Sequence, residues 1–466
     1  MSRSRRRFLS DNFTILTSVA ISTSFGALSS RLAMGSPASR PELVPVNDAN
    51  TGLPLLRLPE GFSYRSFGWT GDAMDDGVLT PSLHDGMGVV KADGDKLTLI
   101  RNHEVSTDGE AIHNELGATY DPQAQGGCSR MHFDSVTGQW LGSHMALSGT
   151  SRNCAGGVTP WGTWLTAEET VLGPDDIDRY KDDAVRKFEK THGWVFEVPA
   201  DGTPTAEPIT GMGRFVHEAV CVDSESGIVY LTEDRDPSGF YRYVPVEPGN
   251  LAAGGELQIA EVVGQEDLRG GFENGSKFGI NWHTIPDPSV ASTPGTETPD
   301  ELGVFMQGKQ LGGSMFARLE GCWFGNNLVY FDATSGGAKQ AGQIWQYDPA
   351  SQELMLLFES PDKPVLNMPD NLCVTPRGGI VLCEDNDYGA NEYPQRMFGL
   401  SPEGELRLFA ENNCILNGEK NGFTGDFRTK EWAGATFSPD GKWLFVNIQT
   451  PGITFAITGP WDSTLL

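Results

Sequence analysis

The amino-acid sequence predicts an all-β fold, a six-bladed β-propeller with a helical insertion and long loop insertions. Three observations predict it: abundant turn residues, large core residues without strong helical periodicity, and a sequence pattern typical of a hairpin that occurs six times. The chain of 466 residues contains 57 glycines and 29 prolines for turns, and 11 tryptophans and 24 phenylalanines for a core. With 38% hydrophobic and 21% charged residues, the composition is that of a globular protein.

The repeated pattern consists of two or three apolar residues, a polar turn, and a run of four or five apolar residues that is followed by polar ones. Such a pattern is typical of a β-hairpin. Further strand-like runs at 193–199 and 343–349 suggest blades of about four strands around a channel. A pair of β-sandwiches is the alternative fold. The six copies lie at residues 88–104, 156–169, 219–234, 321–334, 371–385 and 435–448.

The irregular spacing of the hairpins requires insertions between them. The charged segment 175–192 is predicted to be a helical insertion, and 286–313 a long loop. No linker follows the N-terminal segment, so residues 41–466 are expected to form a single propeller domain.

The N-terminal segment resembles an export signal. Residues 4–10 read SRRRFLS, which fits the twin-arginine pattern, and a modestly apolar stretch follows at 13–32. That stretch is too polar for a confident transmembrane helix. We therefore expect residues 1–40 to be a signal peptide that engages the twin-arginine export machinery, and a periplasmic or extracellular location for the folded protein.

The charge and the cysteines limit the partners and the covalent chemistry. A net charge of −28 argues against a nucleic acid polymer as a partner and is compatible with bound cations. The cysteines number seven and include no C-x-x-C pair, so a disulfide framework is not expected. Cys221, Cys322 and Cys373 stand within apolar runs and are interpreted as small core residues.

Chemically active residues occupy the same place in successive hairpins, just before or within the first strand. Cys154 lies three residues before Gly157, in the column that carboxylates occupy elsewhere, and the sixth copy has Ala433 there with Glu431 nearby. Equivalent strand starts of a propeller converge on one mouth of the channel. The column therefore predicts a metal site. Its other members are Glu218, Glu320 and Asp370, with Asp85 as a looser equivalent.

The ends of the second strands return to the same mouth and are also acidic. So many carboxylates around a narrow channel would repel one another unless cations neutralised them. The alternative is that each is a solvated turn residue. These positions are Glu104, Glu168, Glu169, Glu233, Asp234, Asp332, Glu384, Asp385 and Asn447.

Four segments carry a resemblance to a known family. Residues 101–104 (RNHE), 153–169 (NCAGGVTPWGTWLTAEE), 232–243 (TEDRDPSGFYRY) and 437–461 resemble the PhoX-type alkaline phosphatases. The resemblance implies a six-bladed propeller whose channel mouth holds two ferric ions and two or three calcium ions bridged by an oxo group. It implies hydrolysis of phosphate monoesters, with small phosphorylated metabolites as substrates and a monomeric protein.

The resemblance also implies roles for individual residues. Cys154, Glu218, Glu320 and Asp370 would be iron-side ligands of the catalytic centre, and Arg318, in R-x-E at 318–320, would bind phosphate. A thiolate and hard carboxylates can share a ferric ion, whereas all-oxygen sites suit calcium. The chain is shorter than the well-known phosphatases of the family, so its substrate could differ.

The calcium ligands are less determined by the sequence. We expect Glu104, Glu168, Glu233 and Glu384, with Glu169, Asp234 and Asp385 as alternatives because neighbours on a strand point to opposite faces. His103 and His217 are either supporting partners of these carboxylates or ordinary hydrogen-bonded residues. Two other functions stay open: a calcium-dependent propeller hydrolase of lactones or phosphotriesters, and a non-catalytic propeller that binds a metal or ligand.

Overall fold

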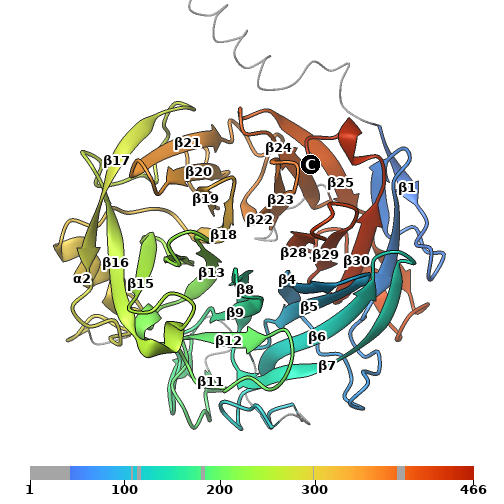
Figure 1. Ribbon diagram of the computed structural model, residues 1–466, viewed down its shortest axis with the longest axis horizontal. Coiled ribbons are helices and arrows are strands. Elements are labelled where there is room, and N and C mark those ends of the chain that lie inside the picture. Colours follow the sequence, from blue (N-terminus) through green and yellow to red (C-terminus); the bar gives the residue numbers. More distant parts are fainter. Residues whose placement is uncertain (1–41, 107–108, 113–116, 180–183, 297–298, 386–393) are drawn as a thin grey trace, which may run out of the picture.

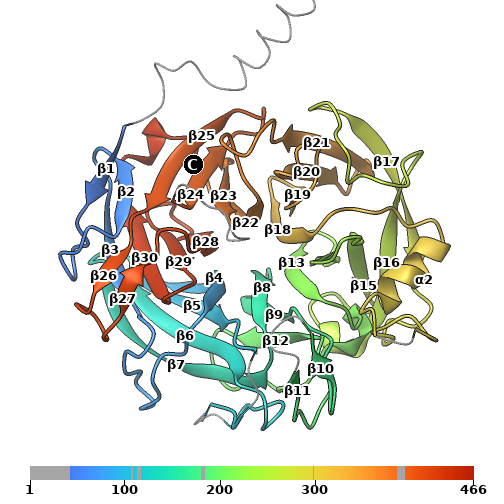
Figure 2. The ribbon, with the colours of Figure 1, turned by 180° about the vertical axis from the view of Figure 1, so that it is seen from behind.

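The strands surround a central axis in a propeller-like ring (Figure 1), and the reverse view shows the same ring from behind (Figure 2). The computed structural model describes residues 42–466 except 107–108, 113–116, 180–183, 297–298 and 386–393. The segment expected to be a signal peptide, residues 1–40, lies outside the described residues. Within them the fold is all-β apart from one α-helix and short 3₁₀ turns, which confirms the all-β part of the predicted fold class.

All six predicted hairpins are present, and the first strand of each lies nearest the axis (Figure 1). These inner strands contact one another in chain order, and the last contacts the first, so they close a ring. The hairpins are β4 (His84–Asp93) with β5 (Lys96–His103), β8 (Asn153–Val158) with β9 (Thr163–Glu168), β13 (His217–Val222) with β14 (Val229–Glu233), β18 (Leu319–Gly325) with β19 (Leu328–Ala333), β22 (Pro369–Val374) with β23 (Ile380–Glu384), and β28 (Trp432–Phe437) with β29 (Leu444–Ile448).

Each hairpin extends outward into an antiparallel sheet. The sheet orders are β4-β5-β6-β7, β8-β9-β12, β28-β29-β30-β3, β22-β23-β24-β25-β2-β1, and a nine-stranded sheet in which β13–β17 join β18–β21 through β17 and β21. The outer strands are β1 (Leu43–Val46), β2 (Leu56–Pro59), β3 (Ser63–Phe67), β6 (Gly126–Asp134), β7 (Gln139–Thr150), β12 (Val195–Pro199), β15 (Tyr241–Pro245), β16 (Gly255–Val262), β17 (Lys277–Thr284), β20 (Gln343–Asp348), β21 (Glu353–Glu359), β24 (Arg396–Leu400), β25 (Leu406–Asn412) and β30 (Ile453–Thr458).

The two ends of the described chain meet in one sheet. Strand β3, near the start, pairs antiparallel with β30, near the end, with Ser63 opposite Thr458. This pairing joins the first and last parts of the ring through backbone hydrogen bonds. Separating the ends therefore requires breaking a strand pair rather than a loop contact.

The two predicted insertions differ from the sequence interpretation. The described part of 175–192 contains the hairpin β10 (Ile177–Asp178) and β11 (Ala184–Val185) instead of a helix. A buried ion pair between Arg186 and Asp178, 2.6 Å apart, fixes this hairpin. The predicted loop 286–313 contains the helix α2 (Gly303–Gln310), which buries Val304 and Phe305. Remaining short elements are β26 (Ile415–Asn417), β27 (Thr424–Asp426) and 3₁₀ turns at Thr210–Met212, Leu251–Ala253 and Trp461–Ser463.

Glycines allow the inner strands to approach closely. A Cβ atom on Gly157 would lie 1.8 Å from the carbonyl oxygen of Val220 on the next inner strand, and one on Gly156 would lie 2.0 Å from that of Leu165. No side chain fits at either position. This glycine pair therefore allows close approach of the backbones at a crowded centre.

The cysteines are buried and unbridged, as the sequence predicts. All seven are free. Cys221 and Cys322 belong to one hydrophobic cluster, with their sulfur atoms 3.4 Å apart, and Cys373 belongs to another, so their interpretation as core residues is confirmed. Among the described residues, no helix has the length and apolarity needed to span a bilayer.

Candidate metal centre

The six hairpins begin in the same way, which places one column of residues around the axis. In each hairpin the first residue or two of the inner strand pair with the end of the second strand, and a β-bulge follows at once. A bulge re-aims the side chains beside it. The column predicted from the sequence occupies this position in every hairpin: Asp85, Cys154, Glu218, Glu320, Asp370 and Ala433.

A second column follows the last residue of each second strand. The backbone nitrogen of Glu169 bonds to the carbonyl of Arg152, and that of Asp234 to the carbonyl of Val216, just before the inner strand. The same bond recurs in all six hairpins. The second column is Glu104, Glu169, Asp234, Thr334, Asp385 and Gln449.

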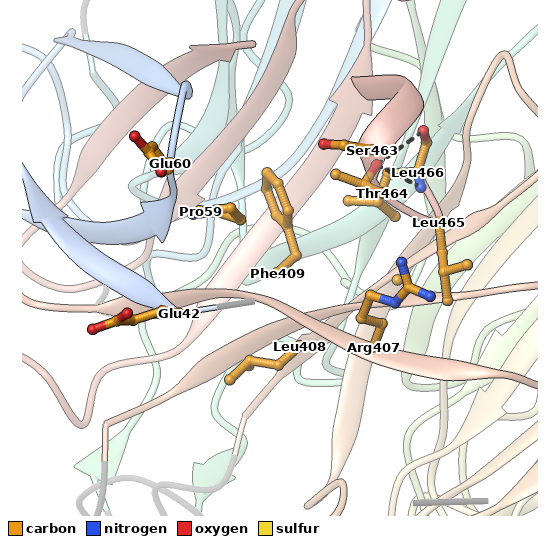
Figure 3. A pocket seen from close by; sticks show the side chains of 11 residues that line it. Glu42, Pro59, Glu60, Arg407, Leu408, Phe409, Ser463, Thr464, Leu465 and Leu466 are labelled. Atoms are coloured by element: carbon orange, nitrogen blue, oxygen red, sulfur yellow. Dashed lines mark hydrogen bonds between the residues drawn. The ribbon is translucent and has the colours of Figure 1, made fainter. Parts of the chain in front are cut away.

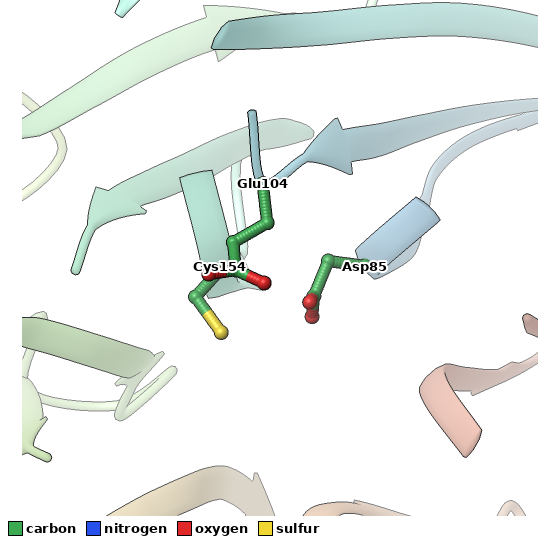
Figure 4. A group of neighbouring side chains, drawn as sticks. All are labelled: Asp85, Glu104 and Cys154. Carbon is green, nitrogen blue, oxygen red and sulfur yellow. The ribbon is translucent and has the colours of Figure 1, made fainter. Parts of the chain in front are cut away.

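Members of the two columns converge on a common space. The ligand atoms of Asp85, Glu104 and Cys154 lie within 4.8 Å of one another (Figure 4), as do those of Cys154, Glu169 and Glu218. Cys154 belongs to both groups and stands at their junction. All these side chains are buried except that of Glu104, which is 16% exposed. One sulfur and four carboxylates are thus gathered at one level of the ring.

Burial and mutual repulsion perturb the acids of this centre. Burial, with the negative charge of Glu104, raises the pKa of Asp85 to about 7. Burial raises the pKa of Glu169 to about 8 against the attraction of Arg152, with Glu104 adding to the rise. Burial and the surrounding carboxylates also raise the pKa of the Cys154 thiol. A cation would remove the cost of ionising these groups together.

The centre extends to the fourth, fifth and sixth hairpins. Burial and then Asp385 raise the pKa of Asp370 well above its usual value, and burial and the same residue raise that of Glu431. Burial, followed by the charges of Glu169 and Asp370, also raises the pKa of Glu218 well above its usual value. These mutual effects join the carboxylates of the ring into one electrostatic unit.

Arg318 lies beside this unit. Its Nε donates to Asp234 at 2.8 Å, and its Nη2 lies 2.5 Å from Glu320. Burial opposes ionisation of Asp234, but Arg318 outweighs it and lowers the pKa of that carboxyl group. The structure therefore brings the predicted phosphate-binding arginine together with the predicted ligands Cys154, Glu218, Glu320 and Asp370.

Three of the predicted calcium ligands face away from the centre. Two oxygens of Glu168 accept bonds from the backbone nitrogens of Ser151, Gly193 and Trp194 and contact His192 at 2.6 Å. Glu384 accepts from Asn367 at 2.8 Å and from the Arg396 guanidinium at 2.6 and 2.8 Å. These carboxylates already have a set of donors.

Glu233 is held through one oxygen only, Oε2, while its Oε1 is buried without a hydrogen-bond partner. It accepts hydrogen bonds from the hydroxyl of Tyr241 at 2.7 Å and from the backbone of Gly239 at 3.0 Å. Burial raises its pKa to about 7, against the effect of Tyr241. The acids that reach the centre are thus the alternatives named from the sequence, Glu169, Asp234 and Asp385. The acids that precede them in the chain hydrogen-bond to groups near the strand ends. Glu104 is the one member of the predicted calcium set that faces the centre.

The two histidines are hydrogen-bonded to backbone carbonyls. His103 contacts the carbonyl of Ser82 and the hydroxyl of Ser129, both at 3.0 Å, and His217 contacts the carbonyl of Gly213 at 2.9 Å. Of the two roles considered for them, these contacts fit the ordinary one.

Sequence reasoning missed Arg152. Its Nη2 lies 2.5 Å from Glu169 and 3.3 Å from Glu104, so it connects the two groups around Cys154. The signal was present in the sequence, because R-x-C at 152–154 has the spacing of R-x-E at 318–320. Gln449 was also missed, and it bonds to Asp85 at 3.1 Å and Glu104 at 2.8 Å.

The axis is closed directly next to the centre. Residues that follow the column on all six inner strands, among them Gly86, Ala155, Ala219 and Asn371, enclose a cavity of only about 10 Å³. That is barely the space of one water molecule. The inner strands are therefore closely packed at the level next to the column.

A larger cavity lies at the periphery and is unrelated to the centre. It has a volume of about 300 Å³ and is lined by Pro59, Phe409 and the C-terminal residues (Figure 3). Strands β2 and β25, which contribute to it, lie on the outer side of their sheet. Among its lining residues, it lacks the clustered carboxylates and sulfur of the centre.

The residues of the centre fit bound cations. The Oε2 atom of Glu218 is buried without a hydrogen-bond partner, although buried carboxylate oxygens rarely stay unpaired. A thiol together with carboxylates suits a transition metal, and carboxylates without a thiol suit calcium. A ring of sheets with a sulfur and many carboxylates at its centre defines a propeller-like protein with a candidate metal centre.

Comparisons with known proteins identify the family. The profile of the family described as alkaline phosphatase PhoX matches residues 42–144 and 134–452. The chain therefore belongs to the PhoX alkaline phosphatase family and is a phosphatase. None of the curated protein sequences matches the chain significantly.

Solved structures resemble this chain to different degrees, and the first one below supports the propeller-like fold. One is PhoX of Pseudomonas fluorescens in complex with vanadate, which is 18% identical with a TM-score of 0.63, over 91% of this chain and 98% of that one. A gluconolactonase from Xanthomonas campestris is 10% identical with a TM-score of 0.42, over 90% of this chain and 98% of that one.

Proposed function

We propose that the protein is an exported, metal-dependent phosphatase that hydrolyses phosphate monoesters at the centre around Cys154. The observation that carries the proposal is the column of one thiol and several carboxylates beside Arg318. A purely structural calcium site has no need of a neighbouring guanidinium. Small phosphorylated metabolites are the proposed substrates, and a monomer exported by the twin-arginine route is the proposed form.

The fold is proposed to be one six-bladed propeller domain over residues 41–466. Each of the six hairpins would be the inner half of a blade. The nine-stranded sheet would then be two blades joined at β17 and β21. The closed ring of inner strands and the pairing of β3 with β30 support this division.

The proposed ligands rest on the family resemblance and are supported by the two groups of side chains that meet at Cys154. Cys154, Glu218, Glu320 and Asp370 would hold two ferric ions. Two or three calcium ions would be held by carboxylates that reach the centre. The candidates are Glu104, Asp85, Glu169, Asp234, Asp385 and Glu431. When bound, the ions would neutralise the phosphoryl oxygens and supply an activated oxygen nucleophile.

Arg318 would orient the substrate. Its guanidinium offers a planar fork of donors that matches phosphate oxygens. Asp234 and Glu320 hold that fork in place at 2.8 and 2.5 Å. The closed axis beneath the column would exclude water from the inner side, so that the ester enters from the open side only.

Elemental analysis of protein purified from its native export route, combined with an assay on p-nitrophenyl phosphate, tests the proposal. Iron and calcium together with activity are expected. Cys154→Ala should lose iron, whereas Cys414→Ala, which removes a buried cysteine of the hydrophobic core, should keep it. A preparation with neither iron nor phosphatase activity would contradict the proposal. Activity with calcium alone, unchanged in Cys154→Ser, would favour the lactone or phosphotriester hydrolase instead.

A further inference from the structure

Two arginines of the centre occupy equivalent places in their hairpins. Arg152 stands two residues before Cys154, and Arg318 two residues before Glu320. Both adopt a left-handed backbone conformation, with φ of 50° and 49°. The carbonyl of each accepts a bond from the residue after the second strand, from Glu169 at 2.9 Å and from Thr334 at 2.8 Å. The two hairpins thus present an arginine in the same way.

The side chains also reach in the same direction. Each arginine contacts the acid that ends the preceding hairpin: Arg152 contacts Glu104 at 3.3 Å, and Arg318 contacts Asp234 at 2.8 Å. Each also contacts an acid of its own hairpin at 2.5 Å. The equivalent positions of the other four hairpins are Leu83, Val216, Met368 and Glu431, so the pair is specific to the second and fourth hairpins.

The two arginines stand at the ends of one chain of contacts. Arg152 contacts Glu169, Glu169 lies close enough to Asp234 to affect the pKa of that carboxyl group, and Asp234 accepts from Arg318. Their side chains are 22% and 18% exposed, among the most accessible of the centre. Each guanidinium group therefore contacts one of two neighbouring carboxylates, Glu169 or Asp234, and is partly exposed to solvent.

The contacts of Arg152 are ones that a bound cation would replace. Glu104 and Glu169 belong to the two candidate ligand groups that meet at Cys154. Carboxylates that coordinate a cation have less negative charge to offer a guanidinium. The Nε atom of Arg152 is buried without a hydrogen-bond partner, so part of its donor capacity is unused even with both acids in contact.

We propose that Arg152 is a second phosphate-binding residue, which contacts the substrate phosphate and the phosphate product from the other end of the Glu169–Asp234 pair. This inference rests on the proposed function of the centre. A second arginine adds charge-assisted hydrogen bonds to an anion that Arg318 alone would hold from one side. It would raise affinity for the doubly charged monoester over singly charged diesters.

Binding of inorganic phosphate to metal-loaded protein tests the proposal. Isothermal titration would compare wild type with Arg152→Gln, Arg152→Lys and Arg318→Gln, and elemental analysis would follow the metals in each preparation. Arg152→Gln should weaken phosphate binding about 10- to 100-fold at unchanged metal content, since it removes charge-assisted bonds. Arg152→Lys should recover part of the loss, because it keeps the charge but not the fork.

The double variant gives a readout that a structural role would not move. If both arginines hold one phosphate, the losses in Arg152→Gln and Arg318→Gln should not multiply in the combined variant. Arg242→Gln is the control, because Arg242 is partly buried on the outer strand β15 and bonds to Gln258. Its phosphate affinity should equal that of wild type.

Three outcomes would overturn the inference. Unchanged phosphate affinity in a fully loaded Arg152→Gln protein would remove Arg152 from the binding site. Loss of metal in both Arg152→Gln and Arg152→Lys would mean that the residue serves only to hold Glu104 and Glu169. A wild-type protein that neither binds phosphate nor hydrolyses its esters would overturn the proposed function itself and the inference with it.

Discussion

Neighbouring carboxylates at the strand ends of this protein have opposite surroundings. Glu168 and Glu384 are enclosed by hydrogen-bond donors, whereas Glu169 and Asp385, one residue further, face other carboxylates. We refer to Glu168, Glu233 and Glu384 as the anchor set, and to Glu169, Asp234 and Asp385 as the centre set. Successive side chains on a strand point to opposite sides. Two acids that are adjacent in the sequence can therefore differ completely, one accepting hydrogen bonds and the other lying beside further carboxylates.

The comparison shows that residue type alone does not define a ligand. An anchor carboxylate stabilises the fold through donors already in place, so a metal would have to displace them. In the centre set, Glu169 and Asp385 lie beside other carboxylates, which raises pKa values there, whereas the charge of Asp234 is compensated by Arg318. The two sets should therefore respond oppositely to substitution: one loses stability, the other loses metal.

Removing an anchor should have the largest effect. Glu384→Ala removes the buried carboxylate that accepts from the Arg396 guanidinium and from the Asn367 backbone nitrogen. Breaking a buried pair of this kind costs about 3–5 kcal/mol of unfolding free energy. Chemical denaturation of the chelator-treated protein would measure it. Glu405→Ala, which breaks the exposed pair with Arg407, is the control and should cost under about 1 kcal/mol. A Glu384→Ala protein of normal stability that has lost metal would reverse the comparison.

Removing an acid of the centre should affect catalysis instead. Glu218→Gln keeps the shape of the side chain but removes a ligand whose Oε2 has no protein partner. We expect phosphatase activity to fall about 1,000-fold, or ~4 kcal/mol in activation free energy. The metal-free variant should unfold at the same or a higher denaturant concentration than wild type, since repulsion with Glu169 and Asp370 is relieved. A large loss of stability would place Glu218 with the anchors.

The anchor set should also give the protein a pH dependence, through His192. Although burial opposes it, contact with Glu168 and Asp121 raises the pKa of His192 to about 9. Tyr120 and Phe188 pack against the same ring. Because the folded-state pKa is raised, the stabilisation is complete below about pH 6.5 and is lost as pH rises through about 9.

The loss is on the order of 3 kcal/mol between those limits. It is measured as the difference in unfolding free energy between wild type and His192→Gln from pH 6 to pH 10. That difference should shrink as the pH rises. A difference that stays constant with pH would show that His192 is uncharged in the folded protein.

Asp385→Asn should give the smallest effect of the four. Asp385 lies close enough to Asp370 and Glu431 to raise the pKa of both. Its charge is one of several around the ions, so we expect about a 10-fold loss in calcium affinity, or ~1.4 kcal/mol. Competition with a fluorescent chelator would measure it. Unaltered calcium affinity would remove Asp385 from the centre set.

Much of the ring was predictable because its hairpins have strong patterns. Apolar runs around polar turns predicted all six, and their alignment predicted the column of Cys154, Glu218, Glu320 and Asp370. The direction of the strand-end acids was not predictable. A bulge after each strand start shifts the register, and a shift of one residue exchanges the two faces.

The error at 175–192 has a tertiary cause. Its many acidic and basic residues suggested an exposed helix, but Asp178 and Arg186 are paired and buried, and Phe188 packs against His192. Such contacts between residues override local helix propensity. Arg152 was not predicted as a site residue, although R-x-C at 152–154 has the same spacing as R-x-E at 318–320.

The closed axis next to Cys154 imposes an order of arrival and departure. If the centre binds ions as proposed, a space of about 10 Å³ is too small for them to pass, so they would enter and leave by the side from which the ester would arrive. Whatever binds last must then depart first. A phosphate ion resting over the centre would retain the metals beneath it, and the enzyme would shed its cations more slowly in phosphate-rich surroundings than in phosphate-poor ones.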